Sequence, residues 1–193
     1  NELGVFAMTE KGLREVTNPS AIFLSRHEQD VPGSVVMVTR EGSRPLLVEV
    51  QALVDESRQG HPKRITVGMD QNRLAMLLAI LHRHGQCSLL DQDVFVNIVG
   101  GLRVMETGGD LAVVAALLSS FKSKNIPKDW VVFGELGLSG EVRPVQNGEE
   151  RLREAAKHGF KIALAPKGNV PKSGVEGLEI HPISVLRDAL SFF

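Results

Sequence analysis

Apolar residues recur along this chain with two different periods, and each period predicts one kind of element. Where apolar and polar residues alternate, or β-branched residues follow one another, we expect strands, because successive side chains of a strand point to opposite faces. This pattern predicts strands over residues 4–8, 13–17, 34–39, 45–54, 64–67, 94–98, 131–133 and 162–164. Leucines at positions 74, 77, 78 and 81 have helical spacing instead, and they predict an amphipathic helix over 71–84.

Capping residues support this helix, and similar residues mark the ends of three more helices. Asp70 is a good N-cap, and Gly85 is expected to end the helix. Further helices are predicted over 109–122, 148–158 and 185–190. Strands that are followed by an alternation of strands and helices are typical of an α/β domain, in which helices pack on a mixed sheet.

The first 29 residues have the pattern of a separate arm. Glu10-Lys11-Gly12 predicts the turn of a hairpin, and Asn18-Pro19-Ser20 predicts a helix start or a turn. The polar stretch that follows ends with Pro32 and Gly33 and indicates a linker, so we place a domain boundary near residue 30. With 193 residues, of which 42% are apolar, the chain is long enough for one domain that carries such an arm.

The charge balance excludes a chain that is strongly basic as a whole. Lysine and arginine number 22 against 23 acidic residues, so any contact with nucleic acid must come from a local patch. A single cysteine, Cys87, excludes an internal disulfide framework and is typical of a reducing cytoplasm. No apolar run approaches the roughly 18 residues of a membrane span, so we expect a cytoplasmic protein without membrane contact. Because the chain begins with Asn1, we expect it to be a piece of a longer protein.

The segment 134–145 is the most distinctive stretch of the sequence. Gly134, Gly137 and Gly140 interrupt an apolar run that leads into Arg143-Pro144-Val145. Glycines at such short intervals beside strand-type residues indicate tight turns or close approach of the backbone, because glycine reaches positive φ without strain. We therefore expect a short strand pair in this segment.

This segment resembles the stretch of Lon-type protease domains that leads into their catalytic lysine. It is more similar still to the Lon-like region of the RadA (Sms) family of bacterial DNA repair proteins. The runs that carry this second resemblance are Asn1–Phe6, Asn18–Leu24, Asn72–Leu78 and His82–Gly85. The resemblance covers residues 30–190 and implies a Lon protease-like domain of the ribosomal protein S5 domain 2-like fold over 30–193. It assigns residues 1–29 to the end of a RecA-like ATPase domain and a linker.

The Lon resemblance also says where a catalytic dyad would lie. These proteases use a serine, in a Pro-Ser-Ala-Gly sequence at the start of a helix, which a neutral lysine activates. Counting back from Ala112 puts the serine position at Gly108, and counting forward from Asp93 puts it at Gly109. The lysine position falls on Glu149. Glycine offers no nucleophile and a carboxylate cannot replace a neutral amine, so we expect no protease activity.

The RadA resemblance implies which function a domain without protease activity would have. Proteins of that family are hexameric ATPases that move branched DNA during homologous recombination, together with RecA. No Gly-x-x-x-x-Gly-Lys-Ser/Thr phosphate loop occurs here, so we expect ATP, Mg and zinc to bind in other domains of the parent and no cofactor in this chain. The expected role is a scaffold that supports a homo-hexameric ring and contacts single-stranded or branched DNA.

Basic residues outside the dyad positions are the candidates for DNA contact. They are Lys63, Arg64, Arg73, Arg83, Lys122, Lys124 and Lys128. The alternative for each of them, taken singly, is an ordinary solvated face. We expect no metal site, because His82, His84 and Cys87 lack the i, i+4 spacing of helical ligands.

Two other functions remain open at this point. One is an active peptidase with a relocated nucleophile, for which Ser119 and Ser139 are the candidates. The other is a module that binds RecA or another repair factor without touching DNA.

Overall fold

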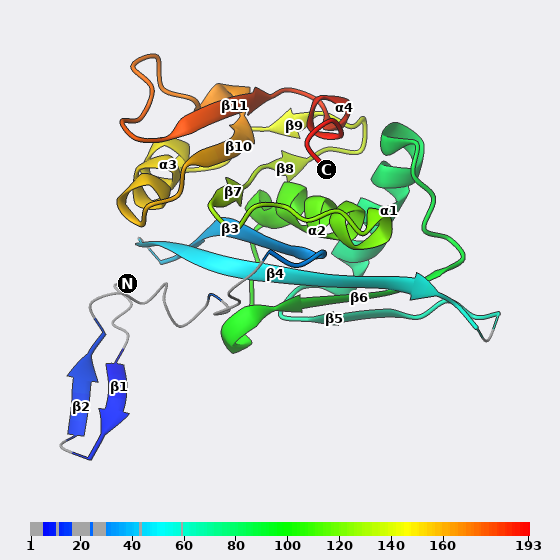
Figure 1. The fold of residues 1–193 in the computed structure, drawn as a ribbon, viewed down its shortest axis with the longest axis horizontal. Coiled ribbons are helices and arrows are strands. Elements are labelled where there is room, and N and C mark those ends of the chain that lie inside the picture. The colour runs from blue at the N-terminus through cyan, green and yellow to red at the C-terminus, as the bar shows by residue number, and fades with distance from the viewer. Residues whose placement is uncertain (1–5, 11, 17–23, 25–29, 43, 59) are drawn as a thin grey trace.

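The alternating apolar residues build one mixed sheet of seven strands. The computed structural model describes residues 6–10, 12–16, 24, 30–42, 44–58 and 60–193. The strand order is β11-β10-β7-β3-β4-β6-β5, which runs from the top to the bottom of Figure 1. The bounds are β3 Ser34–Glu41, β4 Arg44–Glu56, β5 Arg64–Val67, β6 Gln92–Ile98, β7 Trp130–Val132, β10 Ile162–Pro166 and β11 Glu179–Ile183. β4 is antiparallel to both of its neighbours, whereas the other four pairs of strands are parallel.

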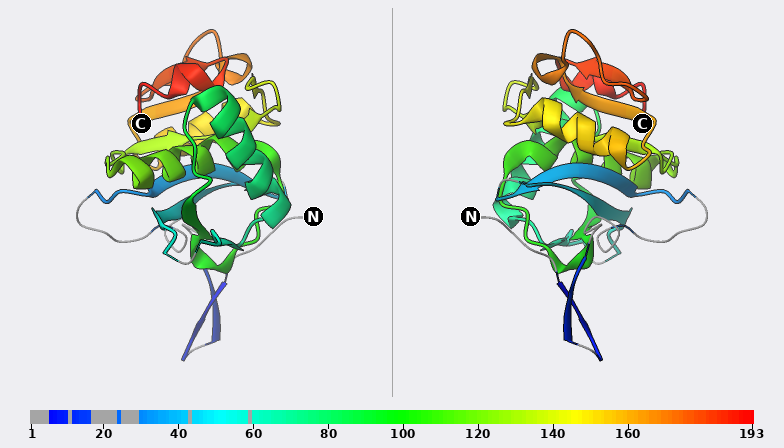
Figure 2. Two further views of the ribbon diagram at one scale, coloured as in Figure 1. Left: turned by 90° about the vertical axis from the view of Figure 1, so that its right-hand side faces the viewer. Right: turned by 90° about the vertical axis from the view of Figure 1, so that its left-hand side faces the viewer.

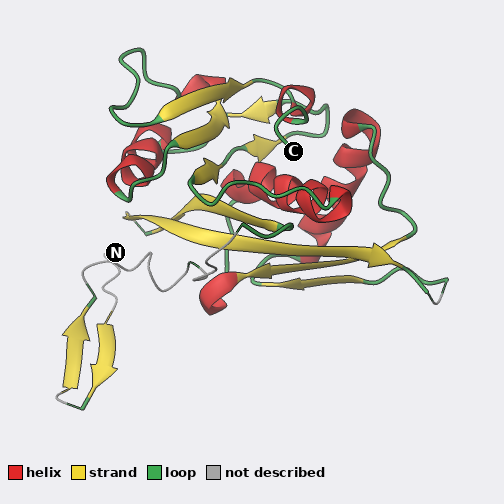
Figure 3. Cartoon of the chain, viewed as in Figure 1, coloured by secondary structure: helices red, strands yellow, loops and turns green. Residues whose placement is uncertain are grey.

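Helices cover both faces of this sheet. α1 (Gln71–Gly85), α2 (Asp110–Lys122) and α4 (Leu186–Ala189) share one hydrophobic core with the even-numbered positions of β4, and Figure 3 shows α2 lying along that strand. α3 (Gly148–Lys157) packs on the opposite face, against a second core that includes Val38 and Leu47. The two end-on views of Figure 2 show α1 in front on one side and α3 in front on the other. The mixed α/β class is therefore confirmed.

Short elements complete the fold around these layers. β1 (Phe6–Thr9) and β2 (Gly12–Glu15) form an antiparallel hairpin, and β8 (Glu135–Leu136) pairs with β9 (Val142–Arg143). Within the described part of the chain, turns of 3₁₀-helix lie at η2 (Val99–Gly101), η3 (Thr107–Gly109) and η4 (Lys167–Asn169). η3 runs directly into α2, so the buried start of that helix is preceded by a tighter turn.

Most of the predicted elements are confirmed to within a few residues. The exceptions have physical reasons. The left-handed residue that ends α1 is Gln86, with φ 53°, rather than Gly85. β11 was not predicted, because a short strand that contains Pro182 does not have the usual strand pattern. The predicted turn or helix start at 18–20, and part of the predicted linker before residue 30, lie outside the described residues.

The glycine-rich segment forms the predicted strand pair. Gly140 has φ +81°, in the left-handed region, and a Cβ at that position would lie 2.7 Å from Cγ of His84. The turn therefore needs glycine both for its backbone conformation and for the approach of α1. Its carbonyl accepts a hydrogen bond from the Leu186 amide over 2.8 Å, which ties the strand pair to the last helix.

Among the residues that the structure describes, no helix covers one half of the second sheet face. α3 covers the region near β3 and the start of β4, whereas β5, β6 and the end of β4 leave their side chains exposed on that face. The exposed fractions are 58% for Leu53, 47% for Ile65 and 55% for Val67. Leu53 and Ile65 both stand in register with Phe95 of β6, so the four residues form a continuous apolar patch, which we call the open sheet face.

Candidate functional site

The two positions that the Lon resemblance assigns to a dyad lie on different elements, and neither has its chemistry. Gly108 is buried in η3, immediately before α2. A Cβ at Gly108 would lie 3.2 Å from Nη1 of Arg151 and 3.3 Å from the carboxyl group of Glu106. Glu149, in the first turn of α3, is half exposed and pairs with Arg153 over 2.6 Å. A charged guanidinium, and not a neutral amine, therefore faces the position that the resemblance assigns to the nucleophile.

Arg151 forms a buried ion pair with Glu106. Its side chain is only 1% exposed, and its Nη1 and Nη2 atoms lie 2.8 and 2.6 Å from the two oxygens of Glu106. Nη1 also donates to the carbonyl of Val38 over 2.7 Å, and Nε donates to the carbonyl of Gln146 over 3.0 Å. The guanidinium lies 5.9 Å from the centre of the Phe133 ring. All three nitrogens are thus hydrogen-bonded, which a buried cation requires.

The same ion pair closes the free part of the β3 edge. β3 pairs with β7 only where Val36 faces Val131. Beyond that point Arg151 donates a hydrogen bond to the carbonyl of Val38, and Glu106 Oε1 accepts one from the Arg40 amide over 2.9 Å. Two side chains therefore occupy the edge along which an extended peptide would otherwise add as a strand.

The environment of Glu106 keeps its carboxylate ionised. Burial raises the pKa of Glu106, but the hydrogen bonds and charge of Arg151, together with the hydrogen bonds from Thr39 and the Arg40 amide, lower it by more. The Thr39 hydroxyl donates to Glu106 over 2.7 Å. The net result is a pKa below the ordinary value for glutamate. A carboxylate held in this way is a structural partner of Arg151 and does not act as a proton donor near neutral pH.

A second ion pair joins α1, α2 and β8 beside the first. Arg73 donates to Asp110 from Nε over 2.9 Å and also from Nη2, and it reaches the Leu136 carbonyl over 3.0 Å. The Leu136 amide donates back to Asp110 over 3.0 Å. Burial raises the pKa of Asp110, and the hydrogen bonds from Arg73 and Leu136 oppose that shift. Bonding to Asp110 raises the pKa of Arg73, so the arginine stays charged.

A pocket of about 100 Å³ lies between these two ion pairs. The starts of α1 and of η3 with α2 border it, and the segment after η2 forms one of its sides. Its apolar walls are formed by Met37, Met69, Ile98, Val104, Met105 and Val113.

The serines that were candidates for a relocated nucleophile have other surroundings. Ser119 is fully buried, and its hydroxyl donates to the Lys124 carbonyl over 2.6 Å and accepts from the Gly33 amide over 2.8 Å. The Ser119 hydroxyl therefore links the segment that follows α2 to the residue that precedes β3. Ser139 is exposed in the turn between β8 and β9. Within the described residues its hydroxyl makes no hydrogen bond to a lysine or a histidine.

Two of the predicted DNA contacts are engaged inside the protein. Arg64 donates to the carbonyls of Lys63 and Leu89 over 2.9 and 2.8 Å, and also to those of Gln92 and Leu90. Its guanidinium thus holds the turn before β6. Arg73 is 21% exposed and is bonded to Asp110, as described above. Sequence reasoning could not separate these arginines from free ones, because their partners are backbone carbonyls and a distant carboxylate.

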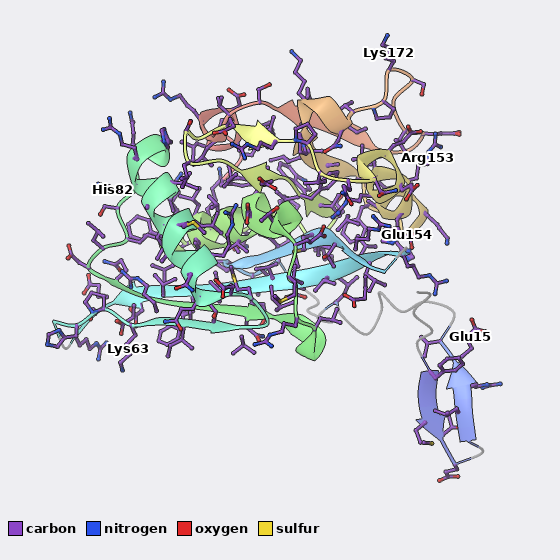
Figure 4. All side chains as sticks on the ribbon, turned by 180° about the vertical axis from the view of Figure 1, so that it is seen from behind. Glu15, Lys63, His82, Arg153, Glu154 and Lys172 are labelled. Carbon is purple, nitrogen blue, oxygen red and sulfur yellow. The ribbon has the colours of Figure 1, made fainter. Side chains whose placement is uncertain are left out.

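The other predicted cations lie on the surface of separate elements. Lys63 is at the tip that precedes β5, and Arg83 follows His82 in the last turn of α1; Figure 4 shows Lys63 and His82 at the same end of the molecule. Lys122, Lys124 and Lys128 are exposed at the end of α2 and in the segment after it, and Lys122 donates to the Phe193 carbonyl over 3.1 Å.

Arg151 and Glu106 were not singled out from the sequence, although one signal was available. Gly148, Arg151, Leu152 and Ala155 are the buried residues of α3, and they are spaced three and four positions apart. An arginine on the apolar stripe of a helix indicates a buried partner. The sequence does not say which carboxylate that partner is.

Within the described ranges no three His, Cys, Asp or Glu side chains gather into a group that could hold a metal ion. His84 is instead bonded through Nε2 to the carbonyl of Leu138 over 2.9 Å. In the same part of the chain, no helix combines the length and the hydrophobicity that crossing a membrane requires.

Comparison with known proteins confirms the resemblance to RadA. The chain is 63% identical over 190 residues to the DNA repair protein RadA of Pseudomonas aeruginosa, and 61% identical over 193 residues to that of Escherichia coli K12. These alignments cover 98% and 100% of the chain but 42% of the length of each relative. Residues 56–169 match the family model described as subunit ChlI of Mg-chelatase. The chain therefore belongs to the family that this ChlI model describes, and it corresponds to a part of the bacterial DNA repair protein RadA.

Proposed function

We propose that this chain is a non-catalytic, Lon protease-like domain of a DNA repair ATPase, with the ribosomal protein S5 domain 2-like fold. In this proposal residues 30–193 form the domain, and residues 1–29 join it to a RecA-like ATPase domain. The domain supports a homo-hexameric ring and contacts single-stranded or branched DNA during homologous recombination. ATP, Mg and zinc then belong to the part of the parent that lies outside this chain, which spans 42% of its closely similar relatives.

The observation that carries the non-catalytic part is the Arg151–Glu106 pair facing Gly108. A serine protease needs a nucleophile beside a base that can accept its proton. Here the nucleophile position lacks a side chain, and the nearest group is a guanidinium, which stays protonated. A fluorophosphonate probe and a casein assay test this on the purified chain. We expect no labelling, and labelling of Ser119 or Ser139 would establish the relocated-peptidase alternative instead.

The open sheet face supports the ring-assembly part. Monomeric proteins rarely leave a continuous apolar patch of this kind in water, and such patches mark contacts with other molecules. Light scattering on the intact chain gives its mass in solution, and Leu53→Glu would place a charge in the middle of the face. We expect this variant to lose any assembly that the unchanged chain forms. Leu138→Glu is the matched control, because Leu138 is 69% exposed and lies outside that face. Equal masses for both variants would contradict a role for the open sheet face.

The DNA-binding part rests on the exposed cations. Each phosphate contact that is lost should lower the slope of log affinity against log salt by about 0.7 to 0.9. We therefore expect Lys63→Ala and Arg83→Ala to weaken binding to single-stranded and branched DNA in mobility-shift assays. Lys172→Ala is the control, because Lys172 lies at the opposite end of the molecule from Lys63 in Figure 4. If all three variants bind alike, DNA contact through these residues is refuted.

The remaining alternative is a module that binds RecA or another repair factor without touching DNA. It predicts no mobility shift by the chain at any salt concentration. A pull-down with purified RecA, carried out in nuclease-treated samples, separates direct protein contact from a contact through shared DNA.

A further inference from the structure

The proposed scaffold role assigns no function to the pocket between the two ion pairs. We propose that it holds one aliphatic side chain of an extended segment of a partner protein, with a basic residue next to that side chain. This is a peptide-recognition site, and it goes beyond ring assembly and DNA contact.

The size and the walls of the pocket fit an aliphatic side chain. Its volume is about 100 Å³, whereas an enclosed apolar cavity of roughly 150 Å³ is large enough for benzene. Met37, Met69 and Met105 form part of the wall, and Met105 is 77% exposed at the mouth. Methionine side chains are flexible and polarisable, and they adapt to different apolar partners. The pocket can thus close around a leucine or an isoleucine side chain.

The segment beside the pocket, from Leu102 to Glu106, is extended at both of its ends and belongs to none of the strands that the structure describes. Leu102 has φ −69° and ψ 148°, and Glu106 has φ −85° and ψ 154°, so both ends of the segment are extended. Between them the Val104 amide donates to the Gly68 carbonyl over 2.8 Å. An extended peptide that lies along this segment would direct alternate side chains toward the pocket, as in recognition by strand addition.

The charges around the mouth favour a basic neighbour. The pocket is lined by three carboxylates, Asp70, Glu106 and Asp110, but by only one guanidinium, that of Arg73. Arg73 pairs with Asp110, and Arg151 pairs with Glu106 from behind the pocket. Among the described residues Asp70 forms no ion pair, and it is exposed at the start of α1. A lysine or arginine beside the buried side chain would meet this carboxylate.

Methionine methyl groups give a direct readout on the intact chain. Five methionines are present, of which three line the pocket, while Met8 and Met76 lie elsewhere. The probe is the peptide acetyl-Ala-Leu-Arg-Ala-amide, titrated against chain labelled with ¹³C at the methionine methyls. We expect saturable shifts of Met69 and Met105 and none of Met8 and Met76. Replacing the leucine of the peptide by serine should weaken binding about tenfold or more, and replacing its arginine by glutamate about threefold.

Three variants locate the site. Val104 is half-buried beside the pocket, and we expect the larger side chain of Val104→Phe to fill the pocket and abolish the methyl shifts. Val67→Phe, the same exchange on the open sheet face, is the control and should leave the shifts unchanged. Asp70→Asn keeps the cap of α1, because asparagine caps as well as aspartate, and it should remove the preference for arginine over glutamate. Shifts that persist in Val104→Phe, or a serine peptide that binds as well as the leucine peptide, would overturn the proposal. DNA binding and the mass of the chain are measured separately, so they do not affect this outcome.

Discussion

Removal of the buried guanidinium at position 151 should be one of the most damaging single changes in this domain. Arg151→Met keeps the apolar stem but removes the cation that pairs with the Glu106 carboxylate and the donor to the Val38 carbonyl. Removing one partner of a buried ion pair costs about 3 to 5 kcal/mol. Glu106 is 28% exposed, so water can partly rehydrate it, and we expect a loss of about 2 to 4 kcal/mol. That is a large share of a total stability of about 5 to 15 kcal/mol.

Urea unfolding, followed by circular dichroism and by the fluorescence of Trp130, measures this loss through the midpoint at constant slope. The double variant Arg151→Met with Glu106→Gln tests its cause. A neutral glutamine can still accept from Thr39 and Arg40, so the double variant should be about 1 to 3 kcal/mol more stable than the sum of the single losses predicts. The reasoning is refuted if Arg151→Met costs less than about 1 kcal/mol, or if the two losses simply add.

Three further outcomes follow from the same contacts. The pKa of Glu106 is lowered in the folded protein, so the ionised carboxylate stabilises the fold fully above the unfolded pKa of about 4.3, and this stabilisation is lost as the pH falls through the folded pKa. Between pH 5 and pH 3 the urea midpoint of Glu106→Gln should therefore fall less than that of the unchanged chain. The pair Gly108→Ser with Glu149→Lys should not hydrolyse a fluorogenic peptide, because Arg151 stands 3.2 Å from the new Cβ; measurable serine-dependent turnover would contradict this. Arg64→Ala should lower the free energy of unfolding by about 1 to 3 kcal/mol, since four carbonyls lose their donor. The salt dependence of DNA binding, measured on folded protein, should stay the same. A lower slope of log affinity against log salt would show that Arg64 contacts DNA.

Local patterns predicted the elements well, because each depends on neighbours in sequence. The strands that became β3 and β4, and the helices α1 and α2, follow from alternation and from spacing of three and four residues. Gly140 was recognised as a turn residue for the same reason, since positive φ is a local property. β11 was missed because its strand character comes from pairing with β10, and not from its own composition.

The roles of the charged residues could not be predicted in this way. Arg64, Arg73, Arg83 and Arg151 look alike in the sequence, yet one is exposed and the other three are bonded within the protein. The difference is made by carbonyls and carboxylates far away along the chain. For Arg151 the decisive partner, Glu106, is 45 residues distant.

The sequence by itself determined that this is an α/β domain related to RadA, and it has glycine and glutamate at the positions that the Lon resemblance assigns to a protease dyad. These are statements about residue identity and local periodicity, which need no knowledge of the fold. Only the tertiary structure decided what surrounds these two positions. The packing of α3 against β3 brings Arg151 to Glu106 and Gly108. Contacts between residues so distant in sequence exist only once the chain has folded, because the hydrophobic core, and not the local sequence, sets which elements meet.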